Sequence, residues 1–184
     1  MLKTSLISTL LTFTLFFLSC SSDREQNAND MVASNEYVLT AINNTQYIVK
    51  KEANGFIVEN TKGKIIIFDI FATWCPPCKA EATHLSSLQA KYKDNLVIIG
   101  ITIEDDISNE KLKEFREMYD AQYTLVNSKD NRRLVDDIVD NLNVGDRFPI
   151  PLMAMYLDGE FITHYVGAIE EEFIESDIKR ALGL

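Results

Sequence analysis

The chain has 184 residues, enough for one domain with a single hydrophobic core. Its formal net charge at pH 7 is −10, and such a surface repels nucleic-acid backbones and anionic membrane surfaces. We therefore exclude nucleic-acid binding. With only three cysteines the chain also cannot carry a framework of several structural disulfides.

Residues 1–19 have the pattern of a secretory signal peptide. Lys3 supplies a positive charge, and residues 6–18 form an apolar run that is shorter than the roughly 20 residues of a membrane-spanning helix. The run ends at Cys20 in the sequence FLSC, which resembles a bacterial lipobox. Cleavage before Cys20 and lipidation of its thiol would anchor the protein to a membrane. The alternative is a secreted protein with a free thiol at this position.

Residues 20–35 form a polar segment without apolar periodicity, and we predict a flexible linker there. The folded domain is expected to cover 36–184. Its apolar pattern alternates between strand and helix periods and predicts an α/β fold. We expect an N-terminal hairpin over 37–51, strands over 56–59, 65–71, 96–103, 123–127, 153–157 and 160–166, and helices over 77–94, 108–119, 131–143 and a last stretch that includes 173–182.

The most informative stretch is the sequence WCPPC at 74–78, directly after the apolar strand 65–71. Proline is favoured in the first helical turn, where its missing N–H removes no hydrogen bond. We therefore expect Cys75 at the N-cap of a helix and Pro76 and Pro77 in its first turn. The positive end of the helix dipole would then lower the pKa of the Cys75 thiol and favour the thiolate.

The spacing of Cys75 and Cys78 fits thiol–disulfide exchange through a mixed disulfide. We predict Cys75 as the exposed attacking thiolate and Cys78 as the partly buried resolving thiol. Such a pair can also be inert, or form half of a zinc site, but zinc needs four ligands. The remaining cysteine is Cys20, and the two histidines, His84 and His164, stand apart, with His84 expected to face solvent. We expect no metal and no cofactor, only a redox-active disulfide.

The strand and the sequence WCPPCKAE that follows it resemble the active-site strand, loop and helix of the thioredoxin superfamily. The match is closer to membrane-anchored extracytoplasmic reductases of the TlpA/ResA type. This resemblance implies a thioredoxin-like fold, with a central mixed β-sheet flanked by helices and an N-terminal β-hairpin extension. It also places Asp69 where thioredoxin has a buried aspartate. A buried carboxyl has a raised pKa and could accept the proton of Cys78; the alternative is that Asp69 faces solvent at a strand end.

A second motif, FPIPL at 148–152, precedes the predicted C-terminal hairpin. In thioredoxin-like proteins an X-Pro bond at this place is cis and packs against the active-site disulfide. Pro151, preceded by Ile150, matches it, and Pro149 is the competing choice. The resemblance implies that the Ile150 backbone pairs with an extended substrate chain. Substrate contacts are thus expected from Trp74, Pro76, Pro77, Ile150 and Pro151.

We interpret the sequence as a lipid-anchored thiol–disulfide oxidoreductase on the periplasmic face of the bacterial cell envelope. The resemblance implies a reductase that acts on proteins with disulfides or thiols, apocytochrome c being the best-known client of such relatives. It also implies a membrane thiol transporter of the DsbD/CcdA kind as electron donor. The alternatives are a disulfide oxidase or isomerase, and a non-catalytic assembly lipoprotein that uses the fold for docking. A peroxidase is not favoured, because no Pro-X-X-X-Thr-X-X-Cys pattern surrounds Cys75.

Overall fold

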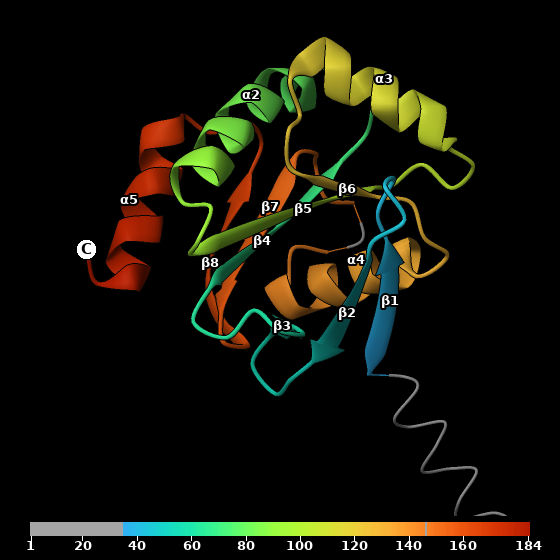
Figure 1. The fold of residues 1–184 in the computed structure, drawn as a ribbon. Helices are drawn as coiled ribbons and strands as arrows, with labels where there is room; N and C mark the ends of the chain where they lie inside the picture. Colours follow the sequence, from blue (N-terminus) through green and yellow to red (C-terminus); the bar gives the residue numbers. More distant parts are fainter. Residues whose placement is uncertain (1–34, 146) are drawn as a thin grey trace, which may run out of the picture. The chain divides into compact units, whose positions relative to one another are not determined.

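A five-stranded mixed sheet lies at the centre of the folded unit (Figure 1). In spatial order the strands are β6 (Thr124–Val126), β5 (Leu96–Thr102), β4 (Ile65–Phe71), β7 (Leu152–Leu157) and β8 (Glu160–Val166). Neighbouring strands pair in parallel from β6 to β4, whereas β7 is antiparallel to both β4 and β8, which confirms the predicted mixed sheet.

The computed structural model describes residues 35–145 and 147–184. The predicted signal peptide, Cys20 and the linker up to residue 34 lie outside the described residues. Within the described part of the chain, no helix is both long and apolar enough to cross a membrane.

The central strand β4 is buried along its whole length, as a near-continuous apolar run predicts for a sheet covered on both faces. Two separate core clusters result, one on each face of the sheet. The first cluster joins the sheet to α2 (Pro76–Lys91), α3 (Asn109–Tyr119) and α5 (Glu171–Leu182), and it contains both described cysteines. The second cluster joins the sheet to α4 (Asn131–Leu142) and to the N-terminal strands.

The N-terminal strands form a separate antiparallel sheet in the order β1-β2-β3, with β1 (Glu36–Thr40), β2 (Gln46–Lys51) and β3 (Phe56–Val58). The predicted hairpin is present, and β3 extends it by a third strand. Phe56 packs against Tyr156 of the central sheet, with ring centroids 5.5 Å apart. The Tyr37 hydroxyl and the Lys51 ammonium both donate to Asp137 of α4 at 2.5 Å, so the small sheet is fixed to this helix.

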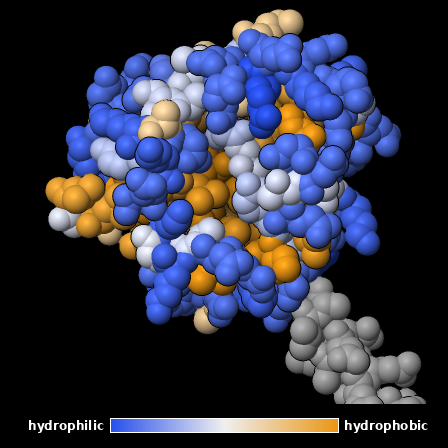
Figure 2. Space-filling model, in the orientation of Figure 1, coloured by the Kyte–Doolittle hydropathy of each residue, from blue (hydrophilic) through white to orange (hydrophobic). Residues whose placement is uncertain are grey.

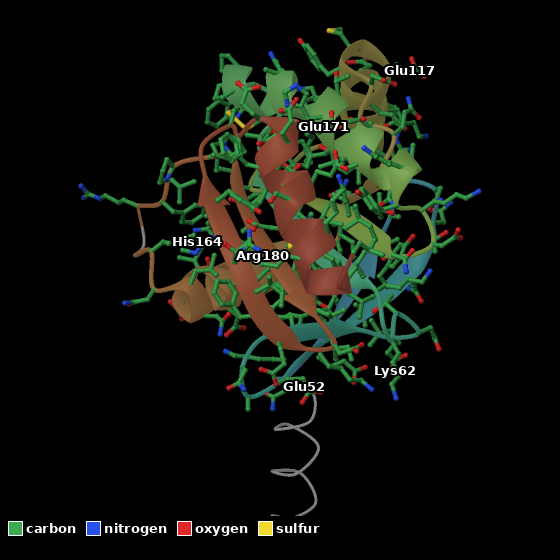
Figure 3. All side chains as sticks on the ribbon, turned by 90° about the vertical axis from the view of Figure 1, so that its left-hand side faces the viewer. Glu52, Lys62, Glu117, His164, Glu171 and Arg180 are labelled. Atoms are coloured by element: carbon green, nitrogen blue, oxygen red, sulfur yellow. A yellow bond between two sulfur atoms is a disulfide. The ribbon has the colours of Figure 1, made fainter. Side chains whose placement is uncertain are left out.

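The surface is mostly hydrophilic in the view of Figure 2, with hydrophobic residues gathered in smaller areas. The two ends of the central sheet differ in the residues that they carry. In Figure 3 the disulfide lies where α2 begins, far from Glu52 and Lys62 at the opposite end of the molecule. The carboxyl ends of β4 and β5 meet at the disulfide end, which is where open α/β sheets place their sites.

Candidate active site

Cys75 and Cys78 are joined by a disulfide, and their Cα atoms lie 5.4 Å apart. The local sequence explains their placement. β4 ends at Phe71, Cys75 stands at the N-cap of α2 in an extended conformation, and prolines occupy the first two helical positions. The predicted start of the helix is therefore confirmed. The two prolines have no N–H, so the Cys78 N–H and the helix dipole are what favour a thiolate at position 75 once the disulfide is reduced.

Our prediction that Cys75 is exposed is wrong for this state of the protein. Cys75 and Cys78 are equally buried, each with 3% of its surface exposed. The Cys75 sulfur is bonded to Cys78, and the carbonyl oxygen of Ile150 lies 3.7 Å from it. The sulfur is enclosed because the loop before β7, distant in sequence, closes over it.

Asp69 is buried on β4, with 3% of its surface exposed, so the solvent-facing alternative is wrong. Side chains alternate along a strand, and Asp69 therefore shares the sheet face of Ile67 and Phe71, whose cluster includes both cysteines. Loss of solvent raises the pKa of Asp69 to about 7, although the Tyr123 hydroxyl, which donates to it at 2.9 Å, opposes this rise. A carboxyl with such a pKa can take up or release a proton near neutrality.

Glu81 is a second buried carboxyl and was not predicted as a site residue. It lies three residues after Cys78, on the same buried face of α2, and only 1% of its surface is exposed. Burial and the nearby charge of Asp69 raise its pKa to about 8, against a hydrogen bond from the Ile169 N–H at 3.0 Å. Oε2 has no hydrogen-bond partner among the described residues. Glu81 thus connects α2 to the segment before α5 and adds a second protonatable group to the site.

Tyr123 is a further residue of the site that was not predicted from the sequence. It is buried, and its pKa is raised well above the usual value by burial and by the neighbouring charge of Asp69, so it stays a neutral hydrogen-bond donor. A tyrosine 54 residues away along the chain offers no local pattern that would connect it with Asp69.

The loop between β4 and the cysteines is held by a third acid. Glu104, two residues after the end of β5, accepts hydrogen bonds from the Thr73 N–H at 2.6 Å and from the Thr73 hydroxyl at 3.1 Å. Glu104 thus fixes the loop that leads to Cys75. No group of three or more potential ligands that could hold a metal occurs in residues 35–145 and 147–184.

The structure brings the predicted substrate-contacting residues to one place around the disulfide. The Ile150–Pro151 peptide bond is cis, as the resemblance implied, and Pro151 rather than Pro149 is therefore the matching proline. Trp74 is 62% exposed, Pro76 and Pro77 are exposed, Ile150 is half-buried and Pro151 is buried.

The prediction for His84 is wrong. Its side chain is half-buried on α2 instead of facing solvent, and Nδ1 is buried without a partner among the described residues. His164 lies on β8, in the antiparallel hairpin of the C-terminal strands. Neither histidine joins a cluster that could hold a metal within the part of the chain that is described.

A thioredoxin-like sheet, a helix that begins at a Cys-Pro-Pro-Cys disulfide and a buried aspartate on the sheet face of the cysteine cluster define the class of thiol–disulfide oxidoreductases. Comparison with known proteins agrees. Residues 42–138 match the model of the AhpC/TSA family, and the chain belongs to this family. A curated relative, the thiol-disulfide oxidoreductase ResA of Bacillus cereus, is 26% identical over 145 residues, covering 72% of this chain and 78% of the relative.

Solved structures support the fold. A putative thiol:disulfide interchange protein DsbE from Chlorobium tepidum superposes with a TM-score of 0.58 at 18% identity, covering 82% of this chain and 95% of that one. StoA from Bacillus subtilis gives a TM-score of 0.56 at 16% identity, covering 79% and 98%. Fold, family and cysteine pair together make this chain a thiol–disulfide oxidoreductase.

Proposed function

We propose that the protein works as a reductase of protein disulfides outside the cytoplasm. The observation that carries the direction is Asp69, a carboxyl with a pKa of about 7 that is buried on the sheet face whose core cluster contains both cysteines. A base at this place assists the step that releases reduced product, since Cys78 must lose a proton before it can attack. The redox-active disulfide needs no further cofactor for this exchange.

The exchange proceeds in two displacements. The Cys75 thiolate attacks one sulfur of the substrate disulfide; the substrate S–S bond breaks, a Cys75–substrate disulfide forms, and the other substrate sulfur leaves as a thiolate that takes up a proton. Asp69 then accepts the proton of the Cys78 thiol. The Cys78 thiolate attacks Cys75, the Cys75–substrate bond breaks and the Cys75–Cys78 bond forms. The second substrate sulfur leaves as a thiolate and takes up a proton, Asp69 gives up the one that it accepted, and two electrons have passed from the protein to the substrate.

Surrounding residues prepare this chemistry. The start of α2 stabilises the Cys75 thiolate, and the Glu104 hydrogen bonds hold the preceding loop in place. Trp74, Pro76, Pro77, Ile150 and Pro151 surround the disulfide, and they are the residues that we propose contact the substrate chain. Glu81, whose pKa is raised by burial and by the charge of Asp69, is a second buried carboxyl that can hold a proton in the same core cluster.

The location and partners follow from the sequence and its resemblance. Cleavage before Cys20 and lipidation of that residue would anchor the domain at the periplasmic face of a bacterial membrane through the linker 20–35. A membrane thiol transporter of the DsbD/CcdA kind would reduce the Cys75–Cys78 disulfide again, and apocytochrome c is the candidate client. Incorporation of labelled fatty acid that is lost in Cys20→Ala tests the anchor.

Insulin reduction by the dithiol form tests the proposed activity. Cys75→Ser should abolish it, and Cys78→Ser should accumulate a mixed disulfide with the substrate, which can then be identified. Activity that survives Cys75→Ser would instead support the docking lipoprotein. Equilibration with glutathione gives the reduction potential of the Cys75–Cys78 pair and so the direction of the reaction. For a reductase this potential should lie nearer to that of thioredoxin, about −270 mV, than to that of the oxidant DsbA, about −120 mV.

A further inference from the structure

A polar pocket at the β6 edge of the central sheet is not part of the substrate-contacting surface described above. The chain after β1 closes this edge, because the Ile42 N–H donates to the Leu125 carbonyl of β6 at 3.0 Å (Figure 1). The pocket opens where these segments meet the last turns of α2 and α3, and its volume is about 260 Å³. Besides Ala41, it is lined by Asn43, Gln89, Arg116, Gln122, Tyr123 and Thr124.

Among the described residues that line the pocket, Arg116 alone carries a charge. It is half-buried in the last turn of α3, and no carboxylate in residues 35–145 and 147–184 forms an ion pair with it. Loss of solvent lowers the pKa of Arg116, but a guanidinium keeps its charge near neutrality. A partly buried charge without a counter-ion costs free energy, so an anion that enters the pocket is stabilised there.

The backbone fixes one edge of the Arg116 guanidinium and leaves another edge free. Nε donates to the Ala121 carbonyl at 3.2 Å, and Nη2 donates to the Tyr123 carbonyl at 2.8 Å. Nη1 has no hydrogen-bond partner in the described part of the chain. The two bonds hold the plane of the guanidinium, so the N–H groups of Nη1 and the second N–H of Nη2 remain for a ligand. Such a pair of N–H groups matches the two oxygens of a carboxylate or a phosphate group.

Two exposed amide side chains add uncharged donors to the pocket. The Asn43 Oδ1 accepts from the Thr45 N–H at 3.0 Å, which leaves the Asn43 amide nitrogen free to donate to a ligand. The side chain of Gln122 is exposed and makes no hydrogen bond to a described residue. Gln89, in contrast, uses both atoms of its amide to bind the backbone of β5 and forms a fixed wall.

The volume and the chemistry of the lining limit what can bind. One water molecule takes about 30 Å³ of liquid volume, so the pocket has room for a ligand with several non-hydrogen atoms. A cation is repelled by Arg116. An apolar ligand would leave the free N–H groups of Arg116, Asn43 and Gln122 without acceptors, which costs free energy. A small anion with several oxygens satisfies both the charge and the donors.

We propose that this pocket binds a small oxyanion, whose carboxylate or phosphate group pairs with Nη1 and Nη2 of Arg116 and whose other oxygens accept from Asn43 and Gln122. The site uses neither cysteine and is independent of the proposed reductase function. Tyr123 is common to both sites, because its carbonyl accepts from Arg116 and its hydroxyl donates to Asp69.

Titration of the oxidised, isotope-labelled protein with inorganic phosphate, and separately with acetate, tests the site by NMR. Sodium chloride at the same ionic strength is the reference. We expect saturable shifts of the backbone amides of residues 121–124 and of the Arg116 Nε–H, with a dissociation constant in about the millimolar range. Saturation by both anions supports a general oxyanion site, and saturation by one of them assigns the ligand to phosphates or to carboxylates.

Three variants separate the pocket from general charge and folding effects. Gln122→Glu keeps the size of an exposed side chain but adds a carboxylate beside Arg116, and it should weaken binding by about tenfold or more. Arg116→Lys keeps the charge without the paired N–H groups and should also weaken it. Lys62→Gln, exposed in the turn before β4, changes the net charge by the same amount as Gln122→Glu and should bind like wild type. Shifts that do not saturate with either anion, or an affinity that survives Gln122→Glu, would overturn the proposal.

Discussion

Asp69→Asn should make the protein more stable at neutral pH, by an amount that depends on pH. The reason is the transfer of an ionisable carboxyl from water to a buried position on β4. Burial is the main cause that raises its pKa from 3.8 to about 7. Between these two values the folded protein holds a proton that the unfolded chain has already lost, so the free energy of unfolding falls as the pH rises.

The magnitude follows from the width of this interval. From 3.8 to about 7 the pKa moves by about three pH units. At about 1.36 kcal/mol for each, the ionised carboxyl lowers the free energy of unfolding by about 4 kcal/mol above pH 7. The amide of the variant has no charge to bury and can still accept from Tyr123. The stability difference between Asp69→Asn and wild type should therefore grow by about 4 kcal/mol between pH 4 and pH 8.

Urea unfolding of the oxidised proteins at intervals from pH 4 to pH 8 measures this difference. The oxidised form is used so that the cysteines do not titrate. Asp106→Asn, the same change on the exposed loop after β5, serves as the control and should stay within about 0.5 kcal/mol of wild type throughout. Glu81 remains in every protein, so part of the fall in the free energy of unfolding with rising pH persists in Asp69→Asn. A stability difference for Asp69→Asn that does not change with pH would refute the reasoning.

Two further substitutions test the contacts around the site and the small sheet. Tyr123→Phe removes the hydroxyl that donates to Asp69 and lowers its pKa. A hydrogen bond to a charged group is worth about 1.5–3 kcal/mol, so the pKa of Asp69 should rise by about one unit or more. The pH midpoint for the rate at which the mixed disulfide is resolved should rise by the same amount. An unchanged midpoint in a rapid-mixing pH profile would contradict this. Asp137→Ala leaves Tyr37 and Lys51 without their shared acceptor and should lower the free energy of unfolding by about 2–3 kcal/mol, measured in urea; a loss below 0.5 kcal/mol would contradict the role of this contact.

The fold was predictable because its signals are local. The near-continuous apolar run of β4 and the prolines after Cys75 each determine the structure of a few neighbouring residues, and the corresponding elements are present. The pairing of β3 with the N-terminal hairpin was not predicted. Strand pairing depends on contacts between distant segments, and the apolar pattern of a short strand is compatible with more than one partner.

The site was predictable where one short segment builds it and not where several meet. The two cysteines and the buried position of Asp69 came from a single strand–loop–helix segment. The burial of Cys75 depends on Ile150, 75 residues further along the chain, and the hydrogen bond to Asp69 comes from Tyr123 on a different element. Glu81 could have been suspected, since a residue three positions after Cys78 lies on the same helix face.

The two buried carboxyls lower the stability of the folded protein. Each destabilises the folded protein when it ionises, and the described hydrogen bonds leave Oδ1 of Asp69 and Oε2 of Glu81 without partners. Apolar residues at both positions would therefore give a more stable domain. Glu81 also has a structural role, since it accepts from the Ile169 N–H before α5. For Asp69 we propose that the lost stability is tolerated because this carboxyl takes up the proton that must leave Cys78.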